Sequence, residues 1–181
     1  MSAPPAFRQQ LLAAIPRLRR YARSLVFDAA AADDIVQIAL ERALGHWRQF
    51  DPQRDIVLWL LSIAHNAHLD TLRRDRRLDV LPPERLTEVQ DARQGLGGDA
   101  GLRLDLSAAL ESLVPDQRSA LLLVLVEQLS YAEAAAVLQV PAGTVMSRVS
   151  RARVAMREWL DGGAAADSPR SANKPDLRRV V

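Results

Sequence analysis

Residues 128–157 have the sequence QLSYAEAAAVLQVPAGTVMSRVSRARVAMR, which is typical of a helix-turn-helix. Ser130 is followed three residues later by Glu133, and this pair forms a capping box that satisfies free backbone donors at a helix start. A short alanine-rich helix over Tyr131 to Leu138 is predicted next. Pro141 cannot donate a backbone hydrogen bond and disfavours helical geometry in the residue before it, so we expect a tight turn there.

A second helix is predicted from about Thr144 to Leu160, with one apolar face at helical spacing. That face consists of Val145, Val149, Ala152, Met156 and Trp159. The opposite side is rich in arginine, which pairs with phosphates and forks onto guanine edges. A solvated basic face is the alternative, but the capped helix and turn before it favour a DNA recognition helix. The candidate DNA contacts are Thr144, Met146, Ser147, Arg148, Ser150, Arg151 and Arg153.

Composition indicates an all-α protein. The 181 residues are 49% hydrophobic and only 4% aromatic, and the apolar positions are mostly Leu, Val and Ala without strand-like alternation. Formal net charge is +2, but Lys174 is the single lysine, so the basic charge is nearly all arginine and locally clustered. The chain has no cysteine, which excludes disulfides, thiolate metal sites and thiol redox sensing.

No targeting or membrane segment is evident in the sequence. The start, MSAPPAFRQQ, lacks the pattern of a secretory signal, and the apolar run from Ala120 to Val126 is too short to span a bilayer. We therefore expect a cytoplasmic protein without membrane insertion.

The N-terminal part predicts three amphipathic helices, over about Ala6 to Phe27, Ala31 to Trp47 and Ile56 to Arg77. Pro16 lies inside the first helix and could kink or split it. Asp33 and Asp34 are placed in the first turn of the second helix, where carboxylates favour the helix dipole.

Two surfaces of these helices are candidate sites. Asp34, Gln37 and Glu41 are predicted to share one exposed face, for which an ordinary solvated acidic face is the alternative. The third helix has a second face that combines an aromatic ring with arginines, for which a structural role of the basic residues at the helix C-terminus is the alternative. Its candidate residues are Trp59, Ile63, Asn66, Arg73, Arg74 and Arg77. Whether Trp59 is a core residue or faces DNA stays open at this point.

Domain boundaries follow from changes in composition. Residues 78–103 contain paired prolines, several glycines and no sustained periodicity, as expected of a flexible linker. Helices over Leu104 to Leu113 and Asp116 to Gln128 precede the helix-turn-helix. We therefore predict two small helical domains, over residues 5–77 and 104–160, and a disordered tail over residues 161–181.

With its motifs in this order along the sequence, the chain resembles the extracytoplasmic-function (ECF) sigma factors of the sigma-70 family. The strings YARSL, ADDIVQIALERAL and WLLSIAHNAHLDTLRR are similar to region two of that family, and LVPDQRSALLLV, LSYAEAAAVL and VPAGTVMSRVSRAR are similar to region four. The resemblance covers nearly everything except the linker and the tail. Two positions depart from the family pattern, since Gln139 stands where glycine is common and Met146 where many members have a basic side chain.

The resemblance implies an alternative sigma factor, active in stress responses, that binds core RNA polymerase and directs it to promoters. Region two would recognise the −10 element and the melted non-template strand, where Asn66 matches a family asparagine, and region four would bind double-stranded DNA at the −35 element. The resemblance also implies an inhibitory anti-sigma factor. The residues that the resemblance implies for polymerase docking are Asp33, Asp34, Val36 and Gln37. Glu41 is added because it is predicted to share an exposed face with Asp34 and Gln37.

Two other functions are alternatives. A sigma-like decoy would bind an anti-sigma factor without initiating transcription, but it would need neither the acidic face nor the recognition-helix arginines. A metal-dependent hydrolase could use His65 and His68, which are three residues apart, but no HExxH pattern or carboxylate cluster accompanies them and His46 is isolated. We expect surface histidines, no metal or cofactor, and no enzymatic activity.

Overall fold

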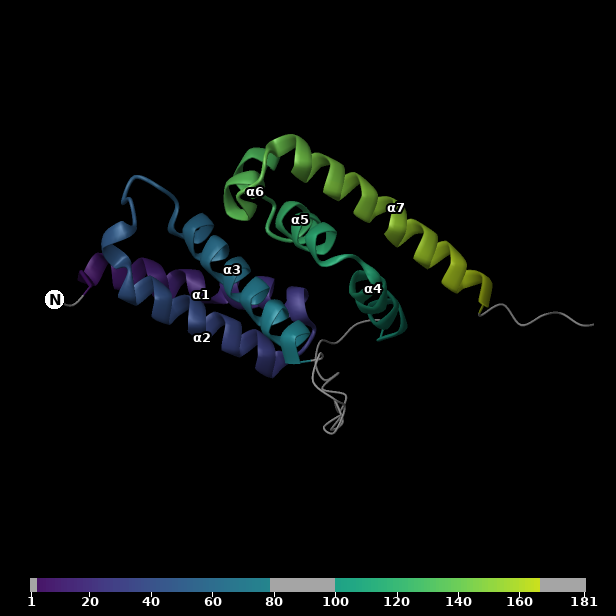
Figure 1. Cartoon of the computed structure of the whole chain (residues 1–181), viewed down its shortest axis with the longest axis horizontal. Coiled ribbons are helices and arrows are strands. Elements are labelled where there is room, and N and C mark those ends of the chain that lie inside the picture. The colour runs from purple at the N-terminus through teal and green to yellow at the C-terminus, as the bar shows by residue number, and fades with distance from the viewer. Residues whose placement is uncertain (1–2, 79–99, 167–181) are drawn as a thin grey trace, which may run out of the picture.

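The computed structural model of the chain describes residues 3–78 and 100–166, and every regular element within these ranges is helical. The all-α prediction is therefore confirmed. Figure 1 shows α1, α2 and α3 together on one side of the molecule and α4 to α7 on the other. The elements are α1 (Pro5–Val26), α2 (Ala29–Gly45), the 3-10 turn η1 (Trp47–Gln49), α3 (Ile56–Leu78), α4 (Ala100–Ser112), α5 (Pro115–Leu125), α6 (Tyr131–Leu138) and α7 (Ala142–Ala166).

The first helix runs without a break through its internal proline. Pro16 lies on the exposed side of α1, and the helix ends at Phe27, which has a left-handed backbone with φ of 57°. Pro16 therefore does not split the helix. The buried stripe that packs α1 onto its neighbours consists of Phe7, Leu11, Ala14, Leu18, Tyr21, Ala22 and Leu25.

Aspartate side chains fix the starts of the next two helices. Asp28 caps α2 by accepting a 2.6 Å hydrogen bond from the backbone of Ala31. The helix thus begins two residues before the predicted Ala31, and the expectation that Asp33 and Asp34 occupy its first turn is wrong. Asp55 similarly accepts a 2.8 Å hydrogen bond from the backbone of Val57 at the start of α3.

The helix-turn-helix forms as its capping box predicts. The backbone N–H of Glu133 donates to Ser130 Oγ at 3.2 Å, and Glu133 Oε2 accepts from the backbone N–H of Ser130 at 2.8 Å. Gln139 ends α6 with φ of 55°, in the left-handed region that favours glycine. Gln139 therefore adopts a backbone conformation that is strained for a residue with a side chain.

The last helix is longer than predicted at both ends. It begins at Ala142, and it continues to Ala166, six residues into the segment that we expected to be a disordered tail. Residues 167–181 lie outside the described residues. Most of the predicted linker, residues 79–99, also lies outside them, whereas residues 100–103 belong to α4. The flexibility of the linker therefore stays a prediction.

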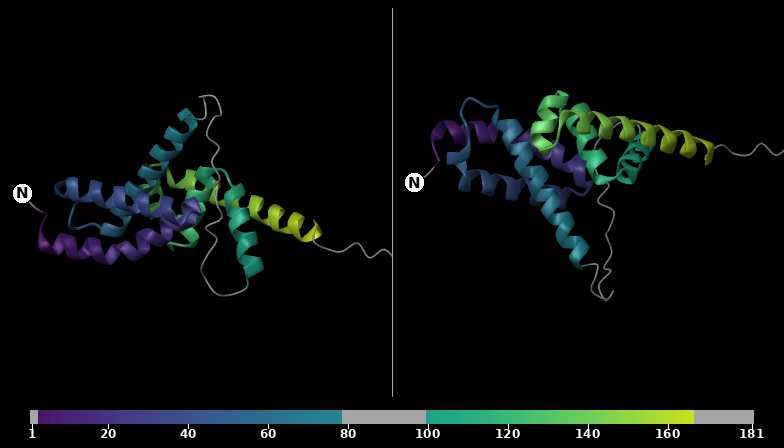
Figure 2. Two further views of the ribbon diagram at one scale, coloured as in Figure 1. Left: turned by 90° about the horizontal axis from the view of Figure 1, so that it is seen from below. Right: turned by 45° about the horizontal axis from the view of Figure 1, so that its top comes forward.

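The two halves pack directly against each other. Helix α3 contacts α6, and α1 contacts α5, so that buried residues from both halves form one continuous hydrophobic core. Figure 2 shows the same arrangement from two further directions. The sequence alone did not indicate these contacts.

Candidate functional site

The acidic face of α2 lies on the surface as the helical spacing predicts. Asp33, Asp34, Gln37 and Glu41 are exposed, whereas Val36 is only 4% exposed and belongs to the core beneath them. Gln37 donates a 2.9 Å hydrogen bond to Glu41, and Asp33 pairs with Arg19 of α1 at 2.9 Å. Among the described residues, no ion pair or hydrogen bond engages the side chain of Asp34, so its carboxylate is available to a partner.

On α3, the candidate residues are held in different environments. The ring of Trp59 is half-buried and contacts Phe7 and Phe50, with ring centroids 6.2 Å and 5.3 Å away. This tryptophan therefore packs at the edge of the core. Arg73 is exposed and donates to Asp70 at 3.3 Å, and Asp70 also accepts from Arg42 of α2 at 3.1 Å.

The remaining α3 candidates follow the helix toward its C-terminal end. Ile63 and Asn66 are half-buried, and Arg74 is exposed. Arg77 belongs to α3, but its side chain lies outside the described residues.

On α7, most of the predicted DNA-contacting side chains are exposed together. Met146, Ser150, Arg151 and Arg153 are exposed, and Thr144 is half-buried one turn from the helix start. Ser147 is half-buried, and its hydroxyl donates a 2.9 Å hydrogen bond to the carbonyl oxygen of Thr144. The hydroxyl proton is therefore already used in a hydrogen bond within the helix.

Arg148 differs from the other α7 arginines because it turns toward a neighbouring helix. Its guanidinium forms an ion pair with Asp116 in the first turn of α5, and its side chain is only 22% exposed. Within this structure it holds the helix.

His65 and His68 are not surface residues, so that expectation is wrong. Both are 5% exposed on the side of α3 that faces the C-terminal half. Burial lowers the pKa of His65 from 6.5 to about 4, helped by the charge of His68 and opposed by Asp116 of α5. Burial likewise lowers the pKa of His68 to about 4, helped by Arg118 of α5. The helical pattern missed this because it accounts only for packing onto α1 and α2.

Because of these two histidines, we expect the folded chain to lose stability in mild acid. Both have a lower pKa in the folded chain than the ordinary 6.5, so the unfolded chain takes up protons that the folded chain does not. The free energy of unfolding should fall as the pH drops below about 6.5 and level off near 4. Between pH 7.5 and 5.0 we expect a loss of about 2 kcal/mol for each histidine. Urea unfolding followed by circular dichroism at both pH values measures it.

The chain offers a matched control for this experiment. His46 is exposed, so His46→Gln should keep the full pH dependence, whereas the double variant His65→Gln, His68→Gln should lose most of it. Equal pH dependence in the wild type and the double variant would show that other groups cause the acid sensitivity.

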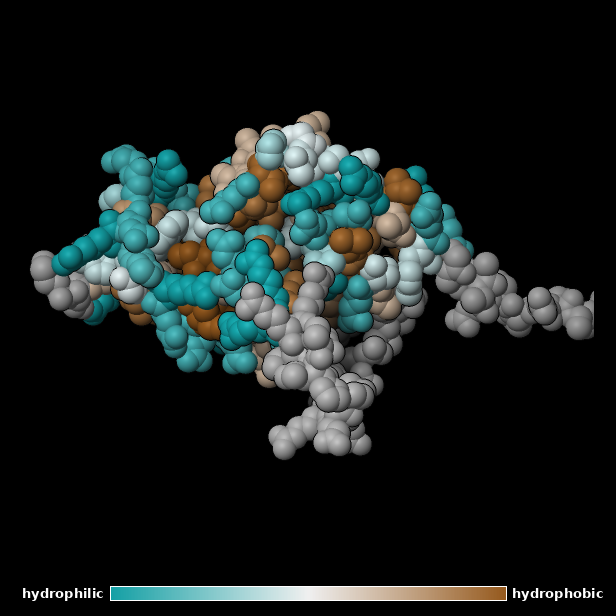
Figure 3. Space-filling model, in the orientation of Figure 1, coloured by the Kyte–Doolittle hydropathy of each residue, from teal (hydrophilic) through white to brown (hydrophobic). Residues whose placement is uncertain are grey.

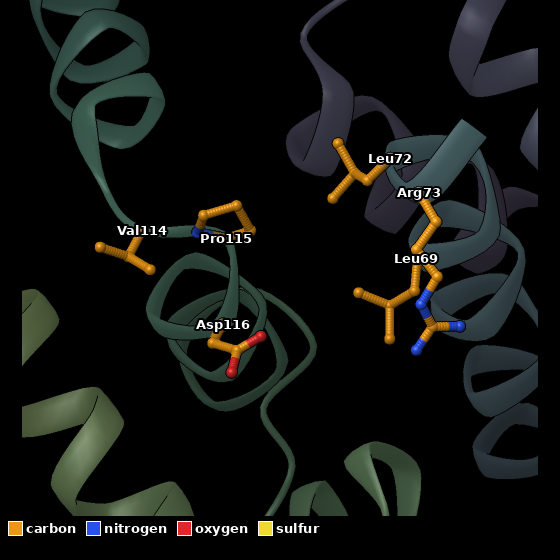
Figure 4. A pocket seen from close by; sticks show the side chains of 6 residues that line it. All are labelled: Leu69, Leu72, Arg73, Val114, Pro115 and Asp116. Atoms are coloured by element: carbon orange, nitrogen blue, oxygen red, sulfur yellow. The ribbon is translucent and has the colours of Figure 1, made fainter. Parts of the chain in front are cut away.

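A groove lies between the two halves beside these histidines. It has a volume of about 300 Å³ and is formed by the C-terminal part of α3 and the junction of α4 with α5. Figure 4 shows the side chains that line it, which are Leu69, Leu72, Arg73, Val114, Pro115 and Asp116. Figure 3 shows that the hydrophobic surface on this side of the molecule is divided into small patches among hydrophilic side chains.

The described part of the chain contains neither a candidate metal site nor a candidate membrane span. Within residues 3–78 and 100–166, no group of three or more histidine, cysteine, aspartate or glutamate side chains could hold a metal ion. None of the helices in these ranges is both long and apolar enough to cross a membrane.

Both halves of the chain match known families. Residues 103–156 match the family described as "Sigma-70, region 4", and residues 11–65 match the family described as "Sigma2 domain of PhyR". The first match contains α6 and the larger part of α7, and the second contains most of α1, all of α2 and the first ten residues of α3.

Similarity also extends across the whole chain. The ECF RNA polymerase sigma factor EcfG of Rhodopseudomonas palustris strain TIE-1 is 36% identical over 176 residues, covering 92% of each chain. The sigma factor RpoE of Bartonella quintana, solved with the anti-sigma factor NepR, superposes with a TM-score of 0.71 at 32% identity, covering 87% of this chain and 98% of that one. The PhyRSL–NepR complex of Sphingomonas sp. Fr1 gives a TM-score of 0.63 at 26% identity, covering 94% and 98%. The chain therefore belongs to the ECF sigma factors of the sigma-70 family.

Proposed function

We propose that this chain binds core RNA polymerase, directs it to specific promoters and helps to melt the DNA for initiation. The observation that carries the proposal is the similarity to a sigma factor over 92% of both chains, which includes both halves rather than the helix-turn-helix alone. Residues 5–77 would form the polymerase and −10 domain, and residues 104–160 the −35 domain.

The acidic face of α2 is the proposed polymerase-docking surface. Asp34, Gln37 and Glu41 present a carboxylate, an amide and a second carboxylate on one exposed side of a rigid helix. Asp33 extends this surface toward α1, where Arg19 holds it. Val36 supports the surface from beneath, since it is buried. Exposed polar groups on a rigid helix suit a specific contact because little conformational entropy is lost on binding.

The exposed end of α3 is proposed to handle the melted −10 strand. Arg73, Arg74 and Arg77 follow one another near the C-terminal end of the helix and can hold the phosphates of a single strand. Asn66 and Ile63 lie further back on the helix and can contact bases. Trp59 would have to leave its contacts with two phenylalanine rings to stack on a base, so we assign it a supporting role in this site.

The exposed side of α7 is proposed to enter the major groove at the −35 element. Residues near the N-terminal end of a recognition helix reach base edges, whereas later residues meet phosphate. Met146, Ser150 and Arg151 are thus the proposed base contacts, and Arg153 a phosphate contact, all four being exposed. Thr144 and Ser147 help to form the start of this helix and border the same surface.

An anti-sigma factor is the proposed regulator. The similar RpoE of Bartonella quintana was solved in complex with the anti-sigma factor NepR. The chain has no cysteine through which it could sense a redox signal itself, so a separate inhibitor is a reasonable source of control. We propose that the protein acts in the cytoplasm and has no enzymatic activity of its own.

A decoy is the second candidate function. It is favoured by the match of residues 11–65 to the sigma domain of PhyR, because the PhyRSL structure is also a complex with NepR. A decoy would bind the anti-sigma factor but would not support transcription. The exposed acidic face of α2 and the arginines of α7 favour the first function, since a decoy requires neither surface.

Transcription in vitro distinguishes the two functions. Purified chain is added to core polymerase on a library of genomic fragments, and the start points of the transcripts are mapped. Transcripts that begin at a common set of sites only when the chain is present would support the sigma factor. Binding to a NepR-type protein without any chain-dependent transcript would establish the decoy instead.

A further inference from the structure

A carboxylate lies in the middle of the surface proposed to bind the melted −10 strand. Asp70 follows Asn66 by four positions and precedes Arg73 by three, so helical spacing places all three on one face of α3. The side chain of Asp70 is 39% exposed. A bare carboxylate at this position would repel the phosphates of a strand, so its partners decide what the site can bind.

Asp70 binds two arginines that come from two different helices. Arg73 of α3 donates from Nη1 to Oδ1 at 3.3 Å, and Arg42 of α2 donates from Nη2 to Oδ2 at 3.1 Å. Each carboxylate oxygen therefore has its own guanidinium. Arg42 lies in the last turn of α2 and reaches Asp70 where α2 packs against α3. This face of α3 thus gains a cation that its own helix does not supply.

Arg42 can bind a further anion while it stays paired. A guanidinium carries five N–H donors, and the hydrogen bond to Asp70 uses one of them. The side chain of Arg42 is 39% exposed and that of Arg73 is 68% exposed, so a strand in solvent can reach both. The cluster of two arginines and one aspartate keeps a net positive charge, which attracts phosphate.

A purely structural ion pair is the alternative. A cation in the last turn of α2 is favourable for the helix dipole, and Arg42 provides it. Exposed ion pairs contribute little to stability, however, and each of the three side chains keeps more than a third of its surface exposed. Helices α2 and α3 already share a core through buried residues such as Ala39 and Leu60. The packing of the two helices therefore leaves the pairing of Arg42 unexplained.

We propose that Arg42 is a further phosphate contact of the −10 surface, supplied by α2 and held beside Arg73 by Asp70. The proposal rests on the proposed function, because it extends the surface assigned there to α3. Arg42 directly follows Glu41, a residue of the proposed docking face. One rigid helix would then contact both the polymerase and the melted strand, which fixes the strand relative to the enzyme.

Salt dependence distinguishes a phosphate contact from a structural one. The chain is assembled with core polymerase, and the probe is a fluorescent single-stranded oligonucleotide with the non-template sequence of a promoter mapped by transcription in vitro. Each phosphate contact to a single strand contributes about 0.7 to the slope of log affinity against log salt. Arg42→Ala should therefore reduce this slope by about 0.7 and weaken binding about tenfold at low salt. Arg42→Lys keeps the cation and should keep the slope.

Two more variants separate the cation from the ion pair. Asp70→Asn breaks the same ion pair but leaves both arginines, so it should bind the probe at least as tightly as the wild type, with the same slope. Arg23→Ala is the matched control, because it removes an exposed arginine of α1 that belongs to none of the proposed surfaces. Each variant is assembled at a concentration that saturates core, and circular dichroism confirms that its helices remain.

The two members of the ion pair should thus differ in their effect on strand binding. Equal losses of affinity in Arg42→Ala and Asp70→Asn would show that the pair is structural and would overturn the proposal. An unchanged slope in Arg42→Ala would overturn it as well. Failure of the wild type to assemble with core would instead refute the proposed function, while binding of oligo(dT) by the chain alone would still measure the contribution of Arg42.

Discussion

Replacing Asp34 and Gln37 together with alanine should weaken binding to core RNA polymerase by about 2 kcal/mol or more, which is about thirtyfold. The carboxylate and the amide lie on the exposed face of α2, where each can make one hydrogen bond to a partner. Neither side chain contributes to the core, so the melting temperature should hardly change. A competition assay with a labelled reference sigma factor measures the affinity.

A matched control separates docking from a general loss of surface polarity. Glu158→Ala with Gln9→Ala also removes one exposed carboxylate and one exposed amide, but from α7 and α1. This control should bind core as the wild type does. If the Asp34 and Gln37 variant competes equally well, the acidic face is merely solvated and polymerase docks elsewhere.

Replacing Arg151 with alanine should cost roughly 1–3 kcal/mol at one position of the −35 element and relax specificity there. Arg151 is exposed on α7, and its planar guanidinium can fork onto a guanine, whereas the exposed Met146 has no proton to donate. Selection from randomised −35 sequences with both proteins measures the change. Met146→Arg should conversely add a guanine preference at one position, since it introduces a second forked donor.

Arg153→Ala is the control for this prediction. Arg153 is exposed later in the same helix, where a phosphate contact is expected. Its loss should weaken all sequences alike and reduce the salt dependence of binding, leaving the selected motif unchanged. If Arg151→Ala also leaves the motif unchanged, Arg151 does not face the groove and the register assumed for α7 is wrong.

The elements of this fold follow from local chemistry, which explains why the sequence predicts them well. The Ser130 and Glu133 capping box specifies the start of α6, and the predicted Tyr131 to Leu138 agrees with the structure at both ends. The exposed acidic face of α2 and the burial of Val145, Val149 and Ala152 on α7 follow from helical spacing alone. The predicted helix boundaries were less accurate where a capping side chain outside the apolar pattern sets the helix start. Asp28, which caps α2, is the example.

The contacts between the halves could not be derived in the same way. Glu127 bonds to arginines more than a hundred positions earlier in the chain, at separations of 110 and 107 residues, and no local pattern connects them. The one available signal was a carboxylate directly after the apolar run from Ala120 to Val126, which places a charge where burial is expected. The burial of His65 and His68 depends on the same long-range packing.

The sequence separation between Arg17 and Glu127 also has a consequence for the order of events during synthesis. A chain grows from its N-terminus at about 5–20 residues per second, so Arg17 exists for about 5–20 s before Glu127 has been added. During that interval α1 and α2 can form, while the buried carboxylate that pairs with Arg17 has not yet been translated. The N-terminal helices can therefore form before the contacts between the halves, and the rate of translation sets the delay between these two steps.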